Sequence, residues 1–581
     1  MHDPLATAVE LHRSGRLREA ERAYRGALRH DPRNPDALHL LGLLAHEAGD
    51  HRAGAELIGR AIEVDARRAV FHFNLGVVLA AAGDATGAER AYRRCLALAP
   101  ERAEAHNNLG LLLHDRGELT GAVAAYRDAL AIDPGHAEAQ VNLARAQQDL
   151  GDEAAALAGF ERALEIDPRL PEAQFGRGRG LEHQGRWAEA ETAYRAALAA
   201  RPDFEAAENN LAAVLLAQGR CREAQAGFER LRARRRGAPA HSAEALLSAG
   251  PAAEAPPAAT RFSLLDRAQQ IEHLVGSGAI GPDFADVAGR LRAVLAEFGS
   301  DESPNERPDD ACDNARDDGE VEGPDWRRAL SADQAARIGG ALDRVVHYAD
   351  APRLAGPAIN PATDFAAIER AYLEGDPPVV QFDDFLSAEA LAGLQRFCRD
   401  STVYFGADPA GFVSATMAHG FNCSLMYQIA EELKAAMPAV LGPHHLSNMW
   451  SYRHRAAGGG VLAHTDLAAV TFNFWIAPED ANLDPQSGGL VVYAKEEPLE
   501  WDWMRINRLK SVPEVQAEIE AFLADAPQIV IPHRSNRAVM FHSNLFHKSD
   551  RFAFVDAFES RRINVSLLFG RRGADAAEPR P

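Results

Sequence analysis

Apolar and polar positions follow a helical period through the first 237 residues, and the pattern recurs every 34 residues. Six of the seven units carry an alanine five residues after a glycine, and six carry an aromatic residue nine after it. The glycines are Gly15, Gly49, Gly83, Gly117, Gly151, Gly185 and Gly219. This spacing predicts two amphipathic helices per unit, with the glycine in the turn between them and the aromatic ring beneath small alanines.

A proline ends five of the units, at Pro32, Pro100, Pro134, Pro168 and Pro202. Together with the glycine, alanine and aromatic positions, it makes residues 1–237 resemble seven tetratricopeptide repeats. The resemblance implies an all-α superhelix, because one unit cannot bury its apolar face without a neighbour. It also implies a protein or peptide partner.

Asparagine shares the 34-residue register in four units, at Asn74, Asn108, Asn142 and Asn210. In tetratricopeptide superhelices the first helix of each unit, which carries these residues, lines the concave face. An amide group both donates and accepts hydrogen bonds, so a ladder of asparagines can bind the backbone of an extended peptide of any sequence. The alternative is that these amides only satisfy neighbouring helix ends.

The composition changes after the seventh unit. An alanine- and proline-rich stretch predicts a linker over 238–261, and the helical period returns over 262–298 as a helical hairpin that could cap the superhelix. Residues 299–325 are acidic, with Val321 as their one large apolar residue, which predicts a disordered linker. These segments separate the repeats from a last domain over 326–575.

Short apolar runs broken by glycine and proline dominate the last domain, after two predicted helices at 388–400 and 424–437. The runs predict strands at 448–453, 460–464, 470–476, 489–493, 529–532, 538–542 and 563–569. Many short strands of this kind predict a β-sandwich or jelly roll with flanking helices and a core over 377–572. An insertion over 501–526 predicts a helix-bearing loop.

Two histidines and an aspartate in this domain are candidate ligands of one metal ion: His464, Asp466 and His547. On a strand, residues two apart face the same way, which aims His464 and Asp466 at one point. A facial set of two histidines and one carboxylate leaves three positions of a ferrous ion open, as oxygen activation requires. Other histidines of the domain, among them His454 and His533, are interpreted as non-ligands.

A late strand carries an arginine on a polar face. Arg562, Asn564 and Ser566 alternate with apolar residues, and an arginine on such a face can bind a carboxylate with two hydrogen bonds. With the candidate metal ligands, this constellation resembles the Fe(II)/2-oxoglutarate-dependent dioxygenases, whose domain is a double-stranded β-helix (jelly roll). The residues implied by the resemblance are His464, Asp466 and His547 as iron ligands, and Arg562 and Tyr452 as residues that bind 2-oxoglutarate.

The resemblance implies Fe(II) as cofactor and 2-oxoglutarate as co-substrate, which is decarboxylated to succinate while a C–H bond is hydroxylated. Tetratricopeptide repeats fused to such oxygenases occur in protein hydroxylases, so the first hypothesis is hydroxylation of a recruited protein or peptide side chain. One alternative is the same chemistry on a small molecule or glycan precursor. Another is an interaction scaffold whose oxygenase domain is inactive. The carboxylate of Asp466 disfavours a halogenase, in which a small residue replaces it.

The net charge of −22 disfavours nucleic acid and anionic membranes as partners, because both attract clustered positive charge. No apolar run approaches the length of a membrane span, and the first residues lack the basic and apolar regions of a signal peptide. The five cysteines form no CxxC pair, so neither a disulfide framework nor a zinc site is indicated. We therefore expect a cytoplasmic protein.

Overall fold

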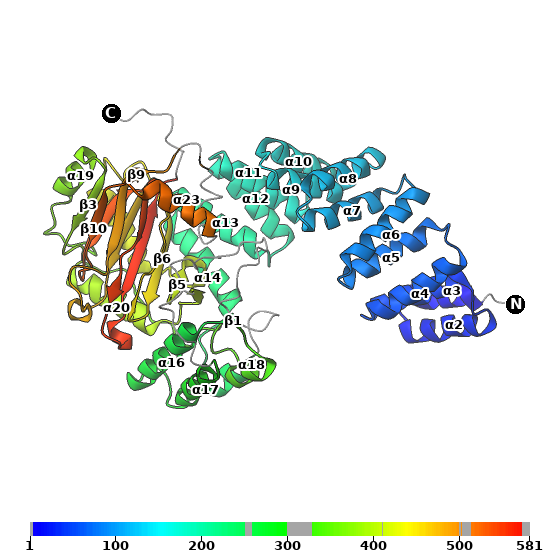
Figure 1. The fold of residues 1–581 in the computed structure, drawn as a ribbon, viewed down its shortest axis with the longest axis horizontal. Coiled ribbons are helices and arrows are strands. Elements are labelled where there is room, and N and C mark those ends of the chain that lie inside the picture. The colour runs from blue at the N-terminus through cyan, green and yellow to red at the C-terminus, as the bar shows by residue number, and fades with distance from the viewer. Residues whose placement is uncertain are drawn as a thin grey trace. The chain divides into compact units, whose positions relative to one another are not determined.

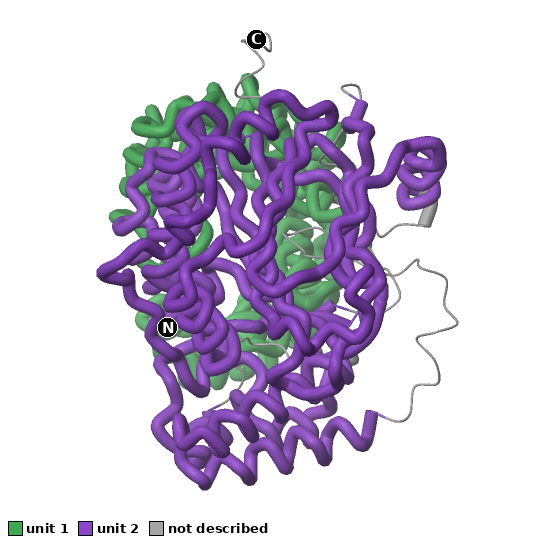
Figure 2. Tube along the Cα trace, turned by 90° about the vertical axis from the view of Figure 1, so that its left-hand side faces the viewer, with its two compact units in different colours: residues 1–207 green, residues 208–581 purple. Residues whose placement is uncertain are grey.

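The computed structural model describes residues 4–249, 258–298, 328–408, 411–498, 501 and 513–571. The acidic linker predicted over 299–325 lies outside these residues. The chain divides into two compact units, Met1–Ala207 and Glu208–Pro581 (Figure 2). The division falls within a helix of the repeat region.

Helices occur in seven consecutive pairs over the described residues up to 236 (Figure 1). They are α1 (Pro4–Arg13), α2 (Leu17–His30), α3 (Pro35–Glu47), α4 (His51–Val64), α5 (Ala69–Ala81), α6 (Ala85–Leu98), α7 (Ala103–Asp115), α8 (Leu119–Ile132), α9 (Ala137–Asp149), α10 (Glu153–Ile166), α11 (Pro171–His183), α12 (Trp187–Ala200), α13 (Glu205–Ala217) and α14 (Cys221–Arg236). The predicted all-helical N-terminal array is confirmed.

The turn glycines and the aromatic residues account for the period. All seven predicted turn glycines adopt the left-handed backbone region, with φ between 72° and 86°, which residues with a Cβ adopt only at a cost. A tyrosine also packs directly on the backbone of the preceding helix. A Cβ added at Gly76 would lie 2.5 Å from the ring of Tyr92. The same contact recurs at Gly110 with Tyr126 and at Gly178 with Tyr194, so a turn glycine and a close ring contact both repeat along the array.

Helix α14, in the second unit, packs against the C-terminal part of the chain. Gln225 Nε2 donates to Ser424 Oγ at 3.2 Å, and Arg236 Nη2 lies 3.2 Å from His419 Nε2. A Cβ on Gly219, in the turn before α14, would lie 2.7 Å from the ring of His445. The last turn of the repeat array is thus part of the same compact unit as the predicted catalytic domain.

The predicted linker over 238–261 is folded where the structure describes it, which corrects that prediction. The elements of this part are α15 (Ala243–Ser248), β1 (Ala258–Ala259), α16 (Arg261–Gly276), α17 (Phe284–Glu297), β2 (Arg328–Ala329) and α18 (Ala332–Ile338). Ala243 and Leu246 are buried in one core with Leu264 and Val287 of the α16–α17 hairpin. The linker has too few large apolar residues to show a period, and it folds because the hairpin offers an apolar surface.

Two antiparallel sheets form the strand-rich region of the second unit, together with two short two-stranded pairs, in the residues that the structure describes. The larger sheet has seven strands in the order β3-β11-β8-β14-β6-β5-β4, and the smaller has the order β10-β9-β12. The strands are β3 (Val379–Phe382), β4 (Gly406–Asp408), β5 (Phe412–Thr416), β6 (Leu446–His454), β7 (Ala457–Gly458), β8 (Val470–Trp475), β9 (Leu490–Glu496), β10 (Gln528–Ile531), β11 (Ala538–His542), β12 (Leu545–Ser549), β13 (Phe552–Ala553) and β14 (Ile563–Phe569).

The two sheets pack face to face. Trp475 of the larger sheet shares a buried core with Leu490, Val492 and Ile531 of the smaller one, so the face that carries Trp475 is the inner face. The opposite face of the larger sheet is covered by helices. There Arg453 of β6 makes a buried ion pair with Asp266 of α16, with Nε donating to Oδ1 at 2.9 Å. The hairpin predicted to cap the superhelix therefore covers the sheet instead.

The remaining helices flank these sheets. They are α19 (Phe365–Glu374), α20 (Ala388–Asp400), α21 (Ser424–Ala436) and α23 (Pro513–Leu523), with short 3-10 helices η1 (Met417–His419), η2 (Glu479–Ala481) and η3 (Phe558–Ser560). Helix α23 confirms that the insertion over 501–526 contains a helix, and it packs with Trp501 against Tyr493 and Phe546. No helix in the described part of the chain combines the length and the apolar run that crossing a membrane requires.

The strand predicted at 460–464 does not form. Gly460 has φ of 69°, which interrupts the extended backbone, and the segment then joins β12 through one isolated bridge between His464 and His547. Strand β12, which carries His547, was not predicted because its apolar run has only two residues before the histidine. The ligands are therefore presented by a loop and by a short strand of the smaller sheet.

Candidate metal centre

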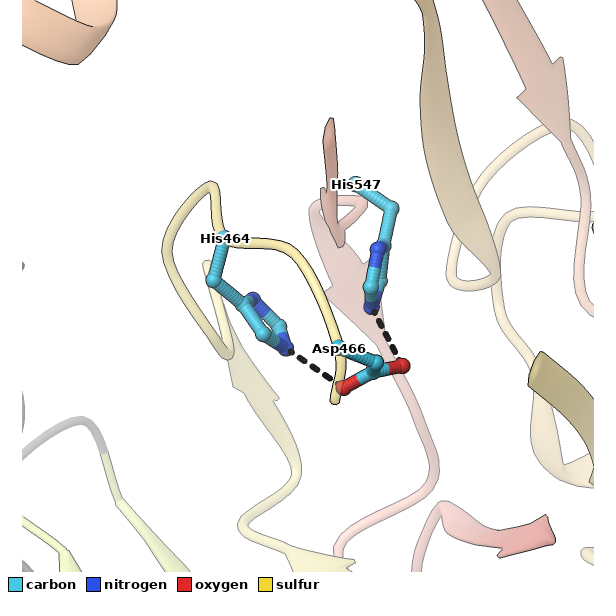
Figure 3. Close-up of side chains that lie close together, drawn as sticks. All are labelled: His464, Asp466 and His547. Carbon is cyan, nitrogen blue, oxygen red and sulfur yellow. Dashed lines mark ion pairs between the residues drawn. The ribbon is translucent and has the colours of Figure 1, made fainter. Parts of the chain in front are cut away.

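Three side chains predicted as metal ligands lie together (Figure 3). One ligand atom from each of His464, Asp466 and His547 lies within 4.8 Å of the others, and no second group of this kind occurs among the described residues. His464 Nε2 is 3.9 Å from Asp466 Oδ1, and His547 Nε2 is 3.5 Å from Asp466 Oδ2. Asp466 and His547 are buried and His464 is half-buried, so the group has one side nearer to solvent.

Main-chain pairing places the two imidazoles side by side. His464 N donates to His547 O at 3.0 Å, and His547 N donates to His464 O at 2.9 Å. Side chains of directly opposed residues in an antiparallel pair project to the same side, and the two ring centroids are 4.3 Å apart. The predicted origin of the cluster, two residues on one face of a strand, is thus replaced by pairing between two segments distant in sequence.

Each imidazole is oriented by a hydrogen bond at its other ring nitrogen. Nδ1 of His464 is 2.8 Å from Leu462 O, and Nδ1 of His547 is 3.2 Å from Leu545 O. A carbonyl oxygen only accepts, so these bonds place a proton on Nδ1, and Nε2 is the ring nitrogen that faces Asp466. Metal-binding histidines characteristically make a bond of this kind to a carbonyl or carboxylate.

The aspartate is held by the hydroxyl of Thr471 and by the main chain of Ser543. Thr471 Oγ1 donates to Asp466 Oδ2 at 2.7 Å, and it lies 2.8 Å from Ser543 Oγ. Asp466 N also donates to Ser543 O at 3.1 Å. Two imidazole nitrogens and a carboxylate oxygen, all oriented in advance, are a donor set that fits a ferrous ion.

A buried carboxylate supports the loop between the two first ligands. Thr465 lies between His464 and Asp466, and its Oγ1 donates to Glu497 Oε2 at 2.6 Å. Glu497 N in turn donates to Asn544 O at 3.0 Å, in the turn that leads to β12. Glu497 therefore connects the loop that carries two ligands with the turn that precedes the third.

Arg562 is buried just before β14, with 1% of its surface exposed. Its Nε donates to Gly488 O at 2.6 Å and its Nη2 to Gly489 O at 2.9 Å, whereas Nη1 has no hydrogen-bond partner among the described residues. Burial lowers the pKa of this guanidinium to about 9, and the charge of Asp550 opposes that shift. A buried guanidinium with a free donor and no ion pair in the described part of the chain fits an anionic ligand.

The register of the larger sheet places Tyr452 and a further polar residue, Asn473, on the same face as Asn564 and Ser566. Tyr452 of β6 lies opposite Asn564 of β14, and Asn473 of β8 lies opposite Ser566. Because Asn564 and Ser566 share their parity with Arg562, all of these residues face the smaller sheet. The ring of Tyr452 packs against Phe412, with centroids 4.9 Å apart.

Comparison with known proteins identifies the repeat region. One tetratricopeptide repeat model matches residues 5–66, 47–100 and 73–137, and a second matches 113–175 and 181–247. Residues 5–247 are tetratricopeptide repeats. No curated protein matches the chain.

Solved structures resemble this tetratricopeptide array. The structure of MamA has 27% identity over 28% of this chain and 94% of that chain, with a TM-score of 0.27. The structure of pilF from Pseudomonas aeruginosa has 20% identity over 34% of this chain and 90% of that chain, with a TM-score of 0.32. YrrB, described as a TPR protein with an unusual peptide-binding site, has 18% identity over 32% of this chain and 95% of that chain, with a TM-score of 0.28.

The asparagines of the tetratricopeptide array lie on the first helices of their repeats, and all four are half-buried. Three of the amides contact the neighbouring repeat. The contacts are Asn74 Nδ2 to His39 Nε2 at 2.7 Å, Asn108 Nδ2 to Tyr92 Oη at 3.4 Å, and Asn142 Nδ2 to Asn107 Oδ1 at 3.0 Å. These bonds join adjacent repeats through side chains, whereas the alternative interpretation named neighbouring helix ends. An amide that makes one such bond retains a second N–H and acceptor capacity.

Sequence reasoning missed the residues that hold the ligands in place. Thr471 could have been found, because it shares a strand face with Asn473 and follows Asp466 closely. Ser543 and Glu497 left no signal, since their relation to Asp466 and Thr465 arises only from contacts between distant segments. Polar residues of this kind are recognised by their burial and bonding rather than by their spacing.

Proposed function

We propose that the strand-rich region of unit 2 is an Fe(II)/2-oxoglutarate-dependent dioxygenase built on a double-stranded β-helix. We further propose that it hydroxylates a side chain of a protein or peptide recruited by the tetratricopeptide array. The observation that carries the proposal is the group of His464, Asp466 and His547, whose ligand atoms lie within 4.8 Å of one another. Two facing antiparallel sheets that enclose this group support the proposed fold.

The residues of the chain would bind and orient the iron and the 2-oxoglutarate, and they would exclude water from the site. His464, Asp466 and His547 would hold the iron through Nε2 and carboxylate atoms that neighbouring groups already orient. Bound iron and 2-oxoglutarate supply oxidative decarboxylation coupled to hydroxylation of a C–H bond. Arg562 would pair with the far carboxylate of 2-oxoglutarate, and Tyr452 lies on the same sheet face.

The array suggests a macromolecular substrate. Tetratricopeptide repeats stack into extended surfaces that bind other chains, and asparagine amides on the first helices can pair with a peptide backbone. The three amides that already contact a neighbouring repeat would each bind the peptide through their second N–H and their carbonyl oxygen. This part of the proposal rests on the architecture rather than on the metal site.

Turnover of 2-oxoglutarate tests the chemistry. The purified protein with Fe(II), 2-oxoglutarate, oxygen and captured partner proteins should release succinate and carbon dioxide, and His464→Ala should abolish this release. His542→Ala is the matched control, because His542 is a half-buried histidine on β11 outside the cluster, and it should retain turnover. Full turnover by His464→Ala would show that the iron assignment is wrong.

Mass spectrometry of the partners tests the substrate class. Partners captured by the wild-type protein should gain one oxygen atom after incubation, and Asn108→Ala combined with Asn142→Ala should lose those partners. Succinate release without oxygen gain on any captured protein would favour a small molecule or glycan precursor as substrate. Partner capture without succinate release would instead favour an interaction scaffold with an inactive oxygenase domain.

A further inference from the structure

Helix α23 packs on the outer face of the smaller sheet. Leu490 and Val492 of β9 belong to the core between the two sheets, so the intervening side chains of β9 point to the opposite, outer face. A separate apolar core lies on that face, and Trp501 and Phe522 pack against it. The buried residues of this outer core are Ala463, Val491, Tyr493, Val515, Ile519, Leu523 and Phe546.

Two residues of the outer core directly precede the two histidine ligands. Ala463 precedes His464, and Phe546 precedes His547. Successive side chains of an extended chain point to opposite sides, so Phe546 faces α23 while His547 faces the other ligands. Ala463 is 4% exposed, and Phe546 has no exposed surface. Helix α23 therefore supports from behind both segments that carry the imidazoles.

The pairing of β12 with β9 is irregular directly before His547. Leu545 lies opposite Glu496, whereas His547 lies opposite Val492, so a step of two residues along β12 corresponds to a step of four along β9. A bulge of this kind bends the strand and re-aims the side chains beside it. The direction of the His547 side chain therefore depends on what holds the extra residues of β9 in place.

Lys495, one of these extra residues, binds the end of α23. Its Nζ donates to Phe522 O at 2.6 Å and to Asp525 Oδ1 at 2.8 Å. The Phe522 ring packs against Phe546, with centroids 5.9 Å apart. Helix α23 thus contacts the bulge on both strands, through an ammonium group on β9 and an aromatic ring on β12.

A polar contact joins the same region to the loop between the first two ligands. Glu497 directly follows β9, is 4% exposed, and accepts from the hydroxyl of Thr465. Its main-chain N also binds the turn before β12. The contacts made by α23 and by Glu497 therefore reach the segments of all three metal ligands from one side.

We propose that helix α23 is a positioning element of the metal centre, and that Ile519 and Phe522 set metal affinity through Ala463 and Phe546. The inference rests on the proposed function and goes beyond it, because it assigns the insertion a control over the metal. Loss of packing behind the two histidine segments leaves space into which they can move, so their Nε2 atoms no longer keep one separation.

Calorimetric titration of the full-length apoprotein with Mn(II) tests this assignment. Ile519→Ala removes fully buried methyl groups from the apolar face of α23 and should lower the affinity for Mn(II) about tenfold. Ile519→Val removes one methyl group and should keep most of the wild-type affinity. Phe522→Leu removes the ring that packs against Phe546 and should lower the affinity as well. Because Phe522 is half-buried, this variant decides if Ile519→Ala does not fold.

A second measurement does not involve the metal. Hydrogen exchange of the apoprotein, followed by mass spectrometry, reports the reciprocal main-chain bonds between His464 and His547. Peptides that cover 461–467 and 545–549 should exchange faster in Ile519→Ala than in the wild type. Leu394→Ala is the matched control, because Leu394 on α20 is fully buried outside the outer core. It should lower stability while Mn(II) affinity and exchange of these peptides stay unchanged.

The outcomes separate this inference from the proposed function. Wild-type Mn(II) affinity and exchange in both Ile519→Ala and Phe522→Leu would overturn the positioning role and leave the metal centre standing. An equal loss of affinity in Leu394→Ala would also overturn it, because general destabilisation would then be the cause. If the wild-type protein binds no Mn(II), the metal centre itself fails and this inference fails with it.

Discussion

His464 and His547 exchange both of their main-chain hydrogen bonds, at 3.0 and 2.9 Å. This reciprocal pair fixes two imidazoles on the same side of two adjacent segments before any metal binds. The orientation of each ring is then set by its Nδ1 bond to a carbonyl two residues earlier. A site organised by backbone pairing needs little rearrangement on binding, which is the condition for a high metal affinity.

The hydroxyl of Thr471 should control metal affinity through Asp466. Thr471→Val keeps the side-chain volume but removes the 2.7 Å bond to Asp466 Oδ2. We expect the affinity for Mn(II), measured by calorimetry on the apoprotein, to fall about 10- to 100-fold. Thr471→Ser retains the hydroxyl and should bind Mn(II) nearly as the wild type does. Equal affinity of the valine variant would mean that Asp466 is oriented without Thr471.

The buried pair between Asp266 and Arg453 should dominate the attachment of the α16–α17 hairpin to the sheet. Asp266→Ala leaves the Arg453 guanidinium, which has no exposed side-chain surface, without its carboxylate. We expect a loss of about 3–5 kcal/mol in the free energy of unfolding, measured by urea denaturation. Asp286→Ala, on the same hairpin, removes an exposed partner of Arg290 and should change stability little. If the two variants lower the free energy of unfolding by similar amounts, burial of the Asp266–Arg453 pair does not determine its contribution to stability.

A turn glycine and a helical glycine should respond in opposite directions to alanine. Gly117 has φ of 75° with open space around its Cβ position, so Gly117→Ala tests backbone strain alone. We expect a loss of about 1–2 kcal/mol in thermal or urea unfolding of the array. Gly59 lies within helix α4 and also has open space, so Gly59→Ala should stabilise by up to about 1 kcal/mol. If both Gly117→Ala and Gly59→Ala destabilise the array, the cause is packing around the added methyl groups and not backbone strain at Gly117.

Acid should destabilise the second unit partly through His533. Its pKa is lowered to about 3 in the folded protein and lies near 6.5 when unfolded, so below pH 6.5 the unfolded state binds the extra proton. Stability is therefore complete above pH 6.5 and declines toward pH 3. At pH 5 the protonation of this residue in the unfolded state lowers the free energy of unfolding by about 2 kcal/mol relative to pH 7.5.

Urea unfolding followed by tryptophan fluorescence at pH 7.5 and pH 5 measures this effect. His533→Phe lacks the titrating group, so its stability should fall by less than that of the wild type over the same interval. An identical decline in the two proteins would assign the acid sensitivity to other buried histidines, such as His419, whose pKa burial also lowers to about 3.

Much of the architecture follows from local pattern. The predicted strand over 563–569 coincides with β14 and the predicted helix over 388–400 coincides with α20, because alternation and helical period depend only on near neighbours. The linker over 238–261 and the strand over 460–464 differ from prediction. In the first, burial of Ala243 depends on a hairpin further along the chain. In the second, a left-handed Gly460 overrides the apolar run.

The sequence by itself determined the repeat period, the number of helical pairs and the residue types available as ligands. The tertiary structure decided that His464 pairs with His547, that Thr471 and Glu497 support the ligand loop, and that Trp475 packs against His533. The physical reason is the range of the forces involved. Periodicity reflects backbone geometry within a few residues, whereas a site forms where hydrogen bonds and buried surfaces join segments that are far apart in the chain.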